Sequence, residues 1–206
     1  MKNIEQSGRS MIEMLGVLAI IGILSVMSIV AYNKGMGQHR ITKALDQVSS
    51  LSSNIRVQFA SDNSYRALVE DGSAASKIVF ENGLFPEDMI RLCASSAEAT
   101  DNSSTCVQNA MNGKTYISVV GSNPREFSIV FEGLPKDACV TMANSDWGSS
   151  AGIRGLRIVK ANNGIVSFGS SFDIPAGSSA ETIAATAAEK CGACGGTDCA
   201  FAWTFF

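Results

Sequence analysis

The sequence predicts an α+β fold in which one long N-terminal helix packs on an antiparallel β-sheet that disulfides stabilise. Three observations support this prediction. Residues 9–60 follow one continuous helical pattern, first apolar and then amphipathic. Several later segments alternate apolar and polar residues between turn signals, as β-strands do. The chain also contains six cysteines, a number typical of a domain exported to an oxidising compartment.

The first half of the predicted helix is apolar enough to cross a membrane. Glu13 is the only ionisable side chain between Arg9 and Tyr32, and residues 14–32 are about as long as a bilayer-spanning helix. The insertion energy of the Leu, Ile and Val residues outweighs the cost of a carboxylate near the helix end. An isolated carboxylate in such a helix is costly, so we expect Glu13 to have a partner.

The second half of the helix is predicted to bury one face. Apolar residues recur with the 3.6-residue period of an α-helix, which indicates one side packed against a domain. The residues of this face are Ile41, Ala44, Leu45, Val48, Leu51, Ile55 and Phe59.

The remaining chain alternates predicted helices and strands, and prolines stand at two of the helix starts. We expect helices at 74–81, 86–93, 134–144 and 181–191 and strands at 115–120, 126–131, 156–160, 164–168 and 199–206. Two of these strand pairs, 115–131 and 156–168, are spaced as hairpins. The net charge of −3 gives no basic field for nucleic acid, so we expect no nucleic-acid partner.

The cysteine cluster near the C-terminus allows three interpretations. Six cysteines suggest three disulfides. Cys191 and Cys194 also form a CxxC motif, but it follows a predicted helix, whereas redox-active thiolates favour a helix N-terminus. With Cys199 they form a three-cysteine pattern that resembles a partial zinc site, but structural zinc needs four ligands and no fourth is close in the sequence. Cys139 is the candidate for the fourth ligand. We expect disulfides, with no catalytic residues, no metal and no cofactor, and therefore no enzyme.

The N-terminus resembles the class III signal of type IV pilins. The order Gly8, four residues ending before Glu13, and then an apolar run matches that signal. The resemblance implies that a prepilin peptidase cuts after Gly8, that Arg9 becomes the N-methylated first residue, and that Glu13 is the fifth. Arg9 stands where the family usually has an apolar residue. The carboxylate of Glu13 would meet the terminal amine of a neighbouring subunit and serve assembly.

The C-terminal half resembles the type IVb pilin domain, the toxin-coregulated pilin group in particular. A strand, GLPKDACVTM, two strands and a helix ending at a cysteine carry this resemblance. It implies a disulfide between Cys139 and Cys191, with Cys194 or Cys199 as alternatives to Cys191. The other pairings that we expect are Cys93–Cys106 and Cys194–Cys199.

The resemblance implies a leader at 1–8, a helix at 9–60 divided into a membrane and assembly part (9–32) and an amphipathic part (33–60), and a globular pilin head at 61–206. It implies a major pilin that polymerises through its helix into a homo-oligomeric surface filament for adhesion, aggregation, motility or secretion. The alternative is a minor pilin or a type II secretion pseudopilin.

The resemblance also implies where the protein resides and what handles it. We expect the inner membrane of a Gram-negative bacterium before assembly, with the N-terminus inside, and an extracellular pilus afterwards. Long domains translocate largely regardless of their charge, so the basic residues after the span do not oppose this topology. The expected partners are the prepilin peptidase, an inner-membrane pilus assembly platform and an outer-membrane secretin.

Overall fold

The structure is a computed structural model that describes residues 11–62, 64–68, 75–91, 106–119, 125–147, 152–161, 168, 171–196 and 198–206. The chain divides into two compact units, an N-terminal unit of residues 1–39 and a globular unit of residues 40–206. The boundary falls inside helix α1, which runs from Met11 to Gln58. The helix is unbroken through Gly35 and Gly37, and it ends within two residues of the predicted end at residue 60. The first two residues of the predicted helix, 9 and 10, lie outside the described residues.

Within the globular unit, α1 buries the face that its periodicity predicts. The buried residues are Ile41, Ala44, Gln47, Val48, Leu51, Ser52 and Ile55. The helix ends at Gln58, where the chain continues in turns, with the Phe59 N–H donating to Ile55 O over 3.1 Å. Phe59 itself is 7% exposed and joins the same core.

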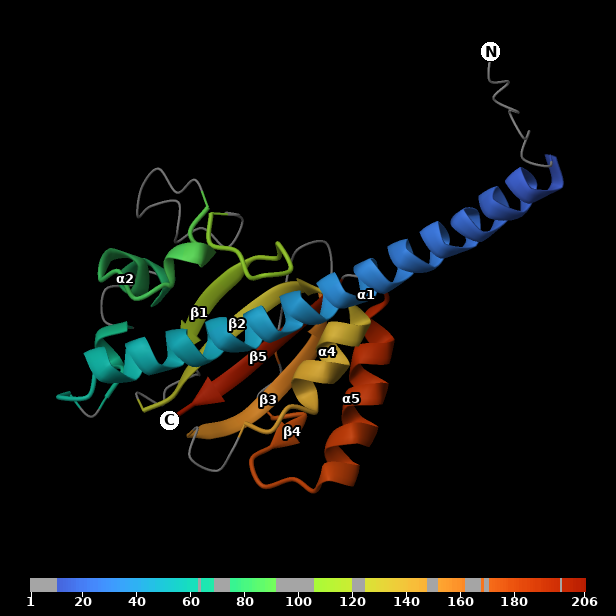
Figure 1. Ribbon diagram of the computed structural model, residues 1–206. Helices are drawn as coiled ribbons and strands as arrows, with labels where there is room; N and C mark the ends of the chain where they lie inside the picture. The colour runs from blue at the N-terminus through green and yellow to red at the C-terminus, as the bar shows by residue number, and fades with distance from the viewer. Residues whose placement is uncertain are drawn as a thin grey trace, which may run out of the picture. The chain divides into compact units, whose positions relative to one another are not determined.

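The globular unit contains one antiparallel sheet with the order β1-β2-β5-β3-β4 (Figure 1). Its strands are β1 (Thr115–Val119), β2 (Phe127–Leu134), β3 (Ile153–Lys160), β4 (Ile174–Pro175) and β5 (Cys199–Phe205). Four of the predicted strands are thus confirmed, at 115–120, 126–131, 156–160 and 199–206. The predicted strand at 164–168 lies outside the described residues except for Phe168, which is not in a strand.

The C-terminal strand β5 occupies the centre of this sheet. Trp203 stands opposite Ile129 of β2 on one side and opposite Leu156 of β3 on the other. All seven residues of β5 are buried. Two strands that are far apart in the chain, β2 and β3, are therefore joined through the last residues of the sequence.

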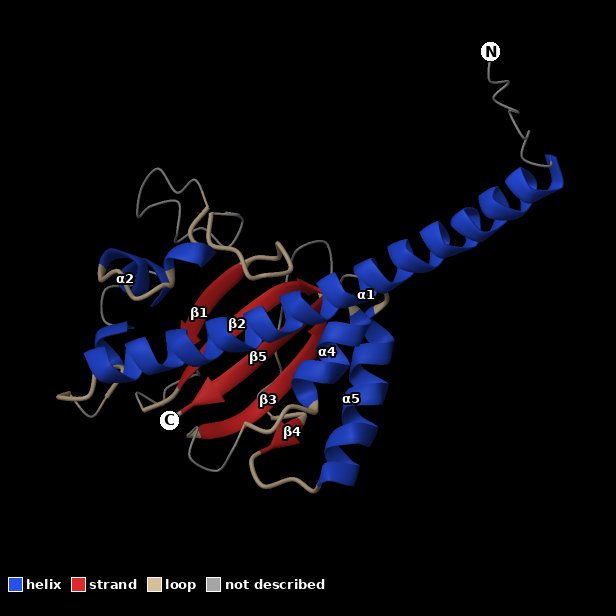
Figure 2. Cartoon of the chain, viewed as in Figure 1, coloured by secondary structure: helices blue, strands red, loops and turns tan. Residues whose placement is uncertain are grey.

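The core lies between one face of the sheet and the helices that cover it. Figure 2 shows α4 (Lys136–Ala143) and the part of α1 beyond residue 40 over the same face. Side chains alternate between the two faces of a strand, which places Phe201, Trp203 and Phe205 together in the core. The Phe201 and Trp203 ring centroids lie 4.4 Å apart, and Phe131 meets Trp203 edge-on at 5.2 Å.

Three of the predicted helices are confirmed. Helix α2 spans Ala75–Glu81, α4 begins directly after Pro135, and α5 spans Ala180–Cys194. Ser179 caps α5 because its hydroxyl accepts the N–H of Thr182 over 3.2 Å.

The helix predicted from Pro86 is wrong. Among the described residues of this segment, 86–91, the only helical turn is the 3-10 turn η2 (Glu87–Met89). A similar turn, η1, lies earlier in the chain at Arg66–Leu68. Ile90 is extended and makes an antiparallel bridge with Val107. The Gln108 N–H also donates to Met89 O over 2.8 Å. Tertiary hydrogen bonds therefore replace the helical bonds that local propensity favoured.

Gln47, a polar residue on the buried face of α1, forms hydrogen bonds to the segments that contain Asp88 and Ala110. Gln47 is 4% exposed. Its amide nitrogen donates to the Asp88 carboxylate over 2.7 Å, and its amide oxygen accepts the Ala110 N–H over 2.9 Å. Burial would raise the pKa of Asp88, but the hydrogen bonds from Gln47 and Lys43 outweigh it and the pKa is lowered. A buried amide with both ends bonded costs little.

Two valines of α1 offer a matched test of this packing. Val48 is 0% exposed and Val57 is 76% exposed. We expect Val48→Ala to lower the free energy of unfolding by about 2 kcal/mol, because it removes buried methyl groups and leaves a cavity. Val57→Ala should change it by less than about 0.5 kcal/mol. Urea unfolding of the detergent-solubilised chain, followed by tryptophan fluorescence, measures both. Equal losses would contradict the packing of α1 described above.

Candidate functional site

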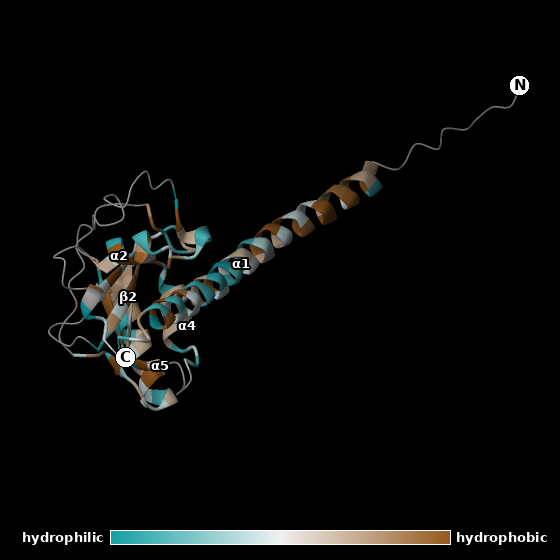
Figure 3. Ribbon diagram, turned by 90° about the vertical axis from the view of Figure 1, so that its left-hand side faces the viewer, coloured by the Kyte–Doolittle hydropathy of each residue, from teal (hydrophilic) through white to brown (hydrophobic). Residues whose placement is uncertain are grey.

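Residues 14–32 of α1 present an apolar helix surface on all sides. Every described residue from Met11 to His39 is exposed, and Figure 3 shows this part of α1 as predominantly hydrophobic. Helix α1 is long and apolar enough to cross a membrane, and none of its most apolar stretch is buried within the chain. By length and composition it therefore suits a lipid bilayer or the apolar core of an assembly.

The hydroxyl groups of two serines in this stretch donate hydrogen bonds to backbone carbonyls of the same helix. Ser25 donates to Ile21 O over 2.7 Å, and Ser28 donates to Leu24 O over 2.8 Å. A hydroxyl without a partner would be costly in an apolar environment. Because each serine bonds within its own helix, neither one opposes burial of the stretch in lipid or against other helices.

Glu13 lies in the first turn of α1 and is exposed. A carboxylate there interacts favourably with the positive end of the helix dipole. No ion pair to Glu13 occurs among the described residues. The predicted cleavage residues Gly8 and Arg9 lie outside the described residues, so the roles of all three remain predictions.

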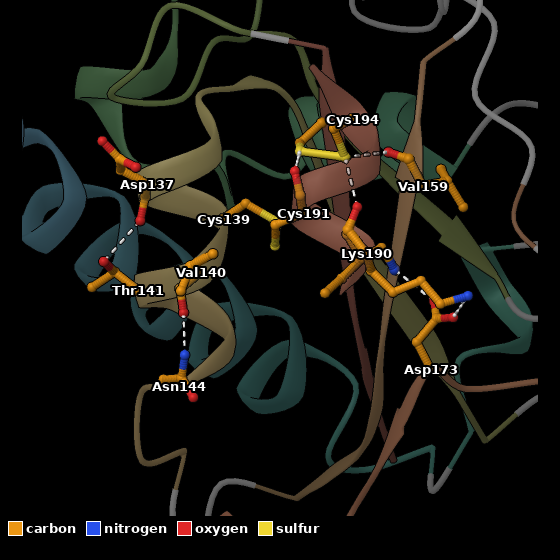
Figure 4. Close-up of a disulfide and its surroundings, with 12 residues drawn as sticks. Asp137, Cys139, Val140, Thr141, Asn144, Val159, Asp173, Lys190, Cys191 and Cys194 are labelled. Atoms are coloured by element: carbon orange, nitrogen blue, oxygen red, sulfur yellow. Dashed lines mark hydrogen bonds and ion pairs between the residues drawn. A yellow bond between two sulfur atoms is a disulfide. The ribbon is translucent and has the colours of Figure 1, made fainter. Parts of the chain in front are cut away.

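The first disulfide of the globular unit joins two helices. It connects Cys139 of α4 to Cys191 of α5, as Figure 4 shows, with the Cα atoms 5.8 Å apart. Both cysteines are 0% exposed. The structure thus brings together the pair that the family resemblance implied, and it holds α4 and α5 side by side across a sequence separation of 52.

The second disulfide joins the end of α5 to the beginning of the central strand β5. It connects Cys194, the last residue of α5, to Cys199, the first residue of β5, with Cα atoms 5.1 Å apart. The Cys194 sulfur also lies 3.7 Å from the Val159 carbonyl of β3. Cys106 is disulfide-bonded as well, but its predicted partner Cys93 lies outside the described residues, so that pairing remains a prediction.

The two disulfides bear on the rival interpretations of the cysteine cluster. Cys191 and Cys194 form bonds with different partners, so the CxxC motif is not a redox pair in this state. A zinc site would need thiolates, which these cysteines and their partners Cys139 and Cys199 lack while oxidised. No group of residues suited to a metal ion occurs in the described parts of the chain.

Asp173 is a residue that sequence reasoning missed, and it ties α5 to the sheet. One carboxylate oxygen accepts the backbone N–H of Ile158 over 2.8 Å, and the other pairs with Lys190 over 2.9 Å (Figure 4). The hydrogen bond to Asp173 raises the pKa of Lys190. A single aspartate in a loop gives no pattern from which its contacts could be predicted. Only the fold brings Asp173 between Ile158 of β3 and Lys190 of α5.

Comparisons with known proteins give consistent matches. The sequence model of a family described as Bundlin matches residues 36–201. Two relatives, each named "Major structural subunit of bundle-forming pilus" and from Escherichia coli O111:H- and O127:H6, are 26% identical over 202 residues. These alignments cover 98% of this chain and 94% of each relative. The chain is also similar to the crystal structure of TcpA, a type IV pilin from Vibrio cholerae El Tor biotype, with 15% identity, a TM-score of 0.46, and coverage of 82% of this chain and 99% of that one.

The two disulfides should differ in their contribution to stability. They span sequence separations of 52 and 5, for which the chain-entropy model gives about 4 and about 2 kcal/mol. We therefore expect Cys139→Ala with Cys191→Ala to lower the free energy of unfolding about twice as much as Cys194→Ala with Cys199→Ala. All four sites are 0% exposed, so the pairs are matched in burial. Denaturant unfolding measures both, and a larger loss from the second pair would contradict the expectation.

Proposed function

The chain belongs to the Bundlin family, and we propose that it is the major structural subunit of a type IV pilus. The observation that carries this proposal is the exposed, apolar first half of α1. Apolar surface of this extent needs an apolar environment, since its exposure to water is unfavourable. The two relatives are named as major structural subunits of a pilus. Their names support the proposal that other copies of the same chain cover this surface in a homo-oligomeric filament.

The same helix surface would be used in two environments. Residues 9–32 would first lie in the inner membrane and then in the core of the filament. Moving from lipid to a helix bundle gains little hydrophobic energy, so close packing has to favour the bundle. Gly16 and Gly22 are exposed and carry no side chain, so the backbone of a neighbouring helix could approach closely at these two positions.

Glu13 would set the axial register between subunits. After cleavage behind Gly8, the amine of Arg9 becomes the chain terminus, and we infer that it pairs with Glu13 of a neighbouring subunit. A buried carboxylate without a partner is strongly disfavoured, whereas a paired one is tolerated. The pair would therefore select one alignment of the helices rather than add much stability.

Processing and export would follow the domain organisation. A prepilin peptidase would remove the leader (1–8) and expose Arg9 for N-methylation. An inner-membrane assembly platform would then extract the subunit through its helix (9–60), and an outer-membrane secretin would pass the filament to the cell surface. The region 61–206 would be displayed outside the cell, where its disulfides are stable. The role is structural rather than enzymatic.

The first test is to shear surface filaments from the native cells and determine the intact mass and N-terminus of this chain. We expect an abundant species that begins at Arg9 and whose cysteines are all oxidised. The same chain found only at trace level would overturn the major-subunit role in favour of a minor pilin or secretion pseudopilin. A chain beginning at Met1 would overturn the pilus proposal itself.

Glu13→Gln should be cleaved normally but should yield at least about tenfold less filament, because a neutral amide cannot form the charge-assisted pair. Asp46→Asn serves as the control, since Asp46 is an exposed carboxylate on the same helix. Quantitative blotting of sheared and cell-bound fractions measures both variants. Wild-type filament yield from Glu13→Gln would contradict the proposed pairing.

Gly8→Val should leave an uncleaved precursor in the membrane, since a side chain at the position before the cut would obstruct the peptidase. Ser7→Ala, one residue earlier, should be processed as in the wild type. N-terminal sequencing or intact mass spectrometry of the membrane fraction distinguishes the two products. A mature chain beginning at Arg9 in the Gly8→Val variant would show that cleavage occurs elsewhere or does not depend on this glycine.

A further inference from the structure

A short basic segment of α1, residues 33–40, directly follows the apolar stretch 14–32. It contains Lys34, His39 and Arg40, and all three side chains are exposed. Figure 3 shows the hydrophobic part of α1 giving way to a more hydrophilic part farther along the helix. The basic segment therefore begins where the stretch that is apolar enough to cross a membrane ends.

The two permanent charges of the basic segment are not used inside the chain. No hydrogen bond or ion pair to the side chain of Lys34 or Arg40 occurs among the described residues. The sequence has no acidic residue at 14–45. Lys43, farther along the helix, differs because its Nζ pairs with Asp88 over 3.0 Å. Lys34 and Arg40 are therefore available to an anion from outside the chain.

These two charges lie on different sides of α1. Six residues separate Lys34 from Arg40, so with 3.6 residues per turn their side chains leave the helix about 120° apart. A protein partner would approach the helix from one side, whereas lipid headgroups surround a membrane-spanning helix. The arrangement therefore favours a lipid layer over a single protein partner.

The distance of both charges from the apolar stretch suits the headgroup layer of a bilayer, which is about 5–8 Å thick on each side. At 1.5 Å per residue, Lys34 lies about 3 Å and Arg40 about 12 Å beyond residue 32 along the helix. Helical side chains point toward the N-terminus of their helix, which here is the direction of the bilayer. The long stems of lysine and arginine can therefore carry both charges back to the headgroups. Residue 32 itself is an exposed tyrosine, a residue type enriched at membrane interfaces.

We propose that Lys34 and Arg40 bind the phosphate groups of anionic phospholipids around the helix before the subunit enters the filament. This inference rests on the membrane stage of the proposed function and adds the class of lipid. A guanidinium donates two parallel hydrogen bonds to a phosphate, and an ammonium attracts it as a point charge. Each basic residue near an anionic surface strengthens binding about fivefold. Because the chain as a whole has a net charge of −3, a preference for anionic lipid would come from this segment.

The test uses the full chain in non-ionic detergent, so that it does not depend on filament assembly. Native mass spectrometry would count the lipid adducts formed from equal amounts of dioleoyl phosphatidylglycerol, which is anionic, and dioleoyl phosphatidylcholine, which is zwitterionic. We expect phosphatidylglycerol adducts to exceed phosphatidylcholine adducts about tenfold. This preference should persist in the presence of inorganic phosphate at the lipid concentration, because free phosphate lacks the acyl chains that contact the apolar stretch.

Two double variants with the same change in net charge then locate the site. Lys34→Gln with Arg40→Gln should reduce the preference to about twofold or less. Arg91→Gln with Lys136→Gln, two exposed residues elsewhere in the globular unit, should leave it unchanged. Unchanged tryptophan fluorescence verifies that each variant is folded.

Four results would overturn the lipid proposal. They are equal binding of both lipids by the wild type, displacement of phosphatidylglycerol by inorganic phosphate, equal losses in the two double variants, and a lower filament yield from Lys34→Gln with Arg40→Gln while its lipid preference is retained. The last result would assign the two charges to contacts between subunits. None of these results bears on whether the chain is a pilus subunit, which the sheared filaments test separately.

Discussion

The pairing of β5 with both β2 and β3 is the interaction on which the globular unit depends. Without β5, the β1–β2 and β3–β4 pairs share no hydrogen bonds in the described sheet. The strand also carries Trp203, around which the aromatic core is arranged. Because β5 comes last in the chain, these contacts join residues of large sequence separation, and such contacts form slowly during folding.

The disulfides and one ion pair hold this late strand in place. Cys194–Cys199 fixes the point at which β5 begins, and Cys139–Cys191 fixes the helix before it. Asp173 connects that helix to β3 through Lys190. The segment between Cys139 and Cys191 is therefore anchored at its ends by the disulfide and near Asp173 by native contacts. Of these, only the disulfide persists in the unfolded chain and restricts its conformations.

Helix α1 meets two different physical demands with one continuous hydrogen-bonded backbone. Beyond residue 40 its apolar residues keep to one face, and Val48 and Leu51 are completely buried by the globular unit. Over residues 14–32 the apolar residues surround the helix, and all of them are exposed in the part of the chain that the structure describes. The same secondary structure thus stabilises a domain at one end and requires lipid or other subunits at the other.

The sequence by itself determined the features that depend on local periodicity. These are the length of α1, its buried face, four strands and the helices α2, α4 and α5. It also indicated the proposed assembly residues, since a carboxylate in an apolar helix stands out without any structure. Only the tertiary structure decided what depends on distant partners. It placed β5 at the centre of the sheet, because pairing order is not encoded in the pattern of any one strand. It also replaced the helix after Pro86 by a short turn, since Ile90 bonds Val107, and it brought Asp173 to Lys190.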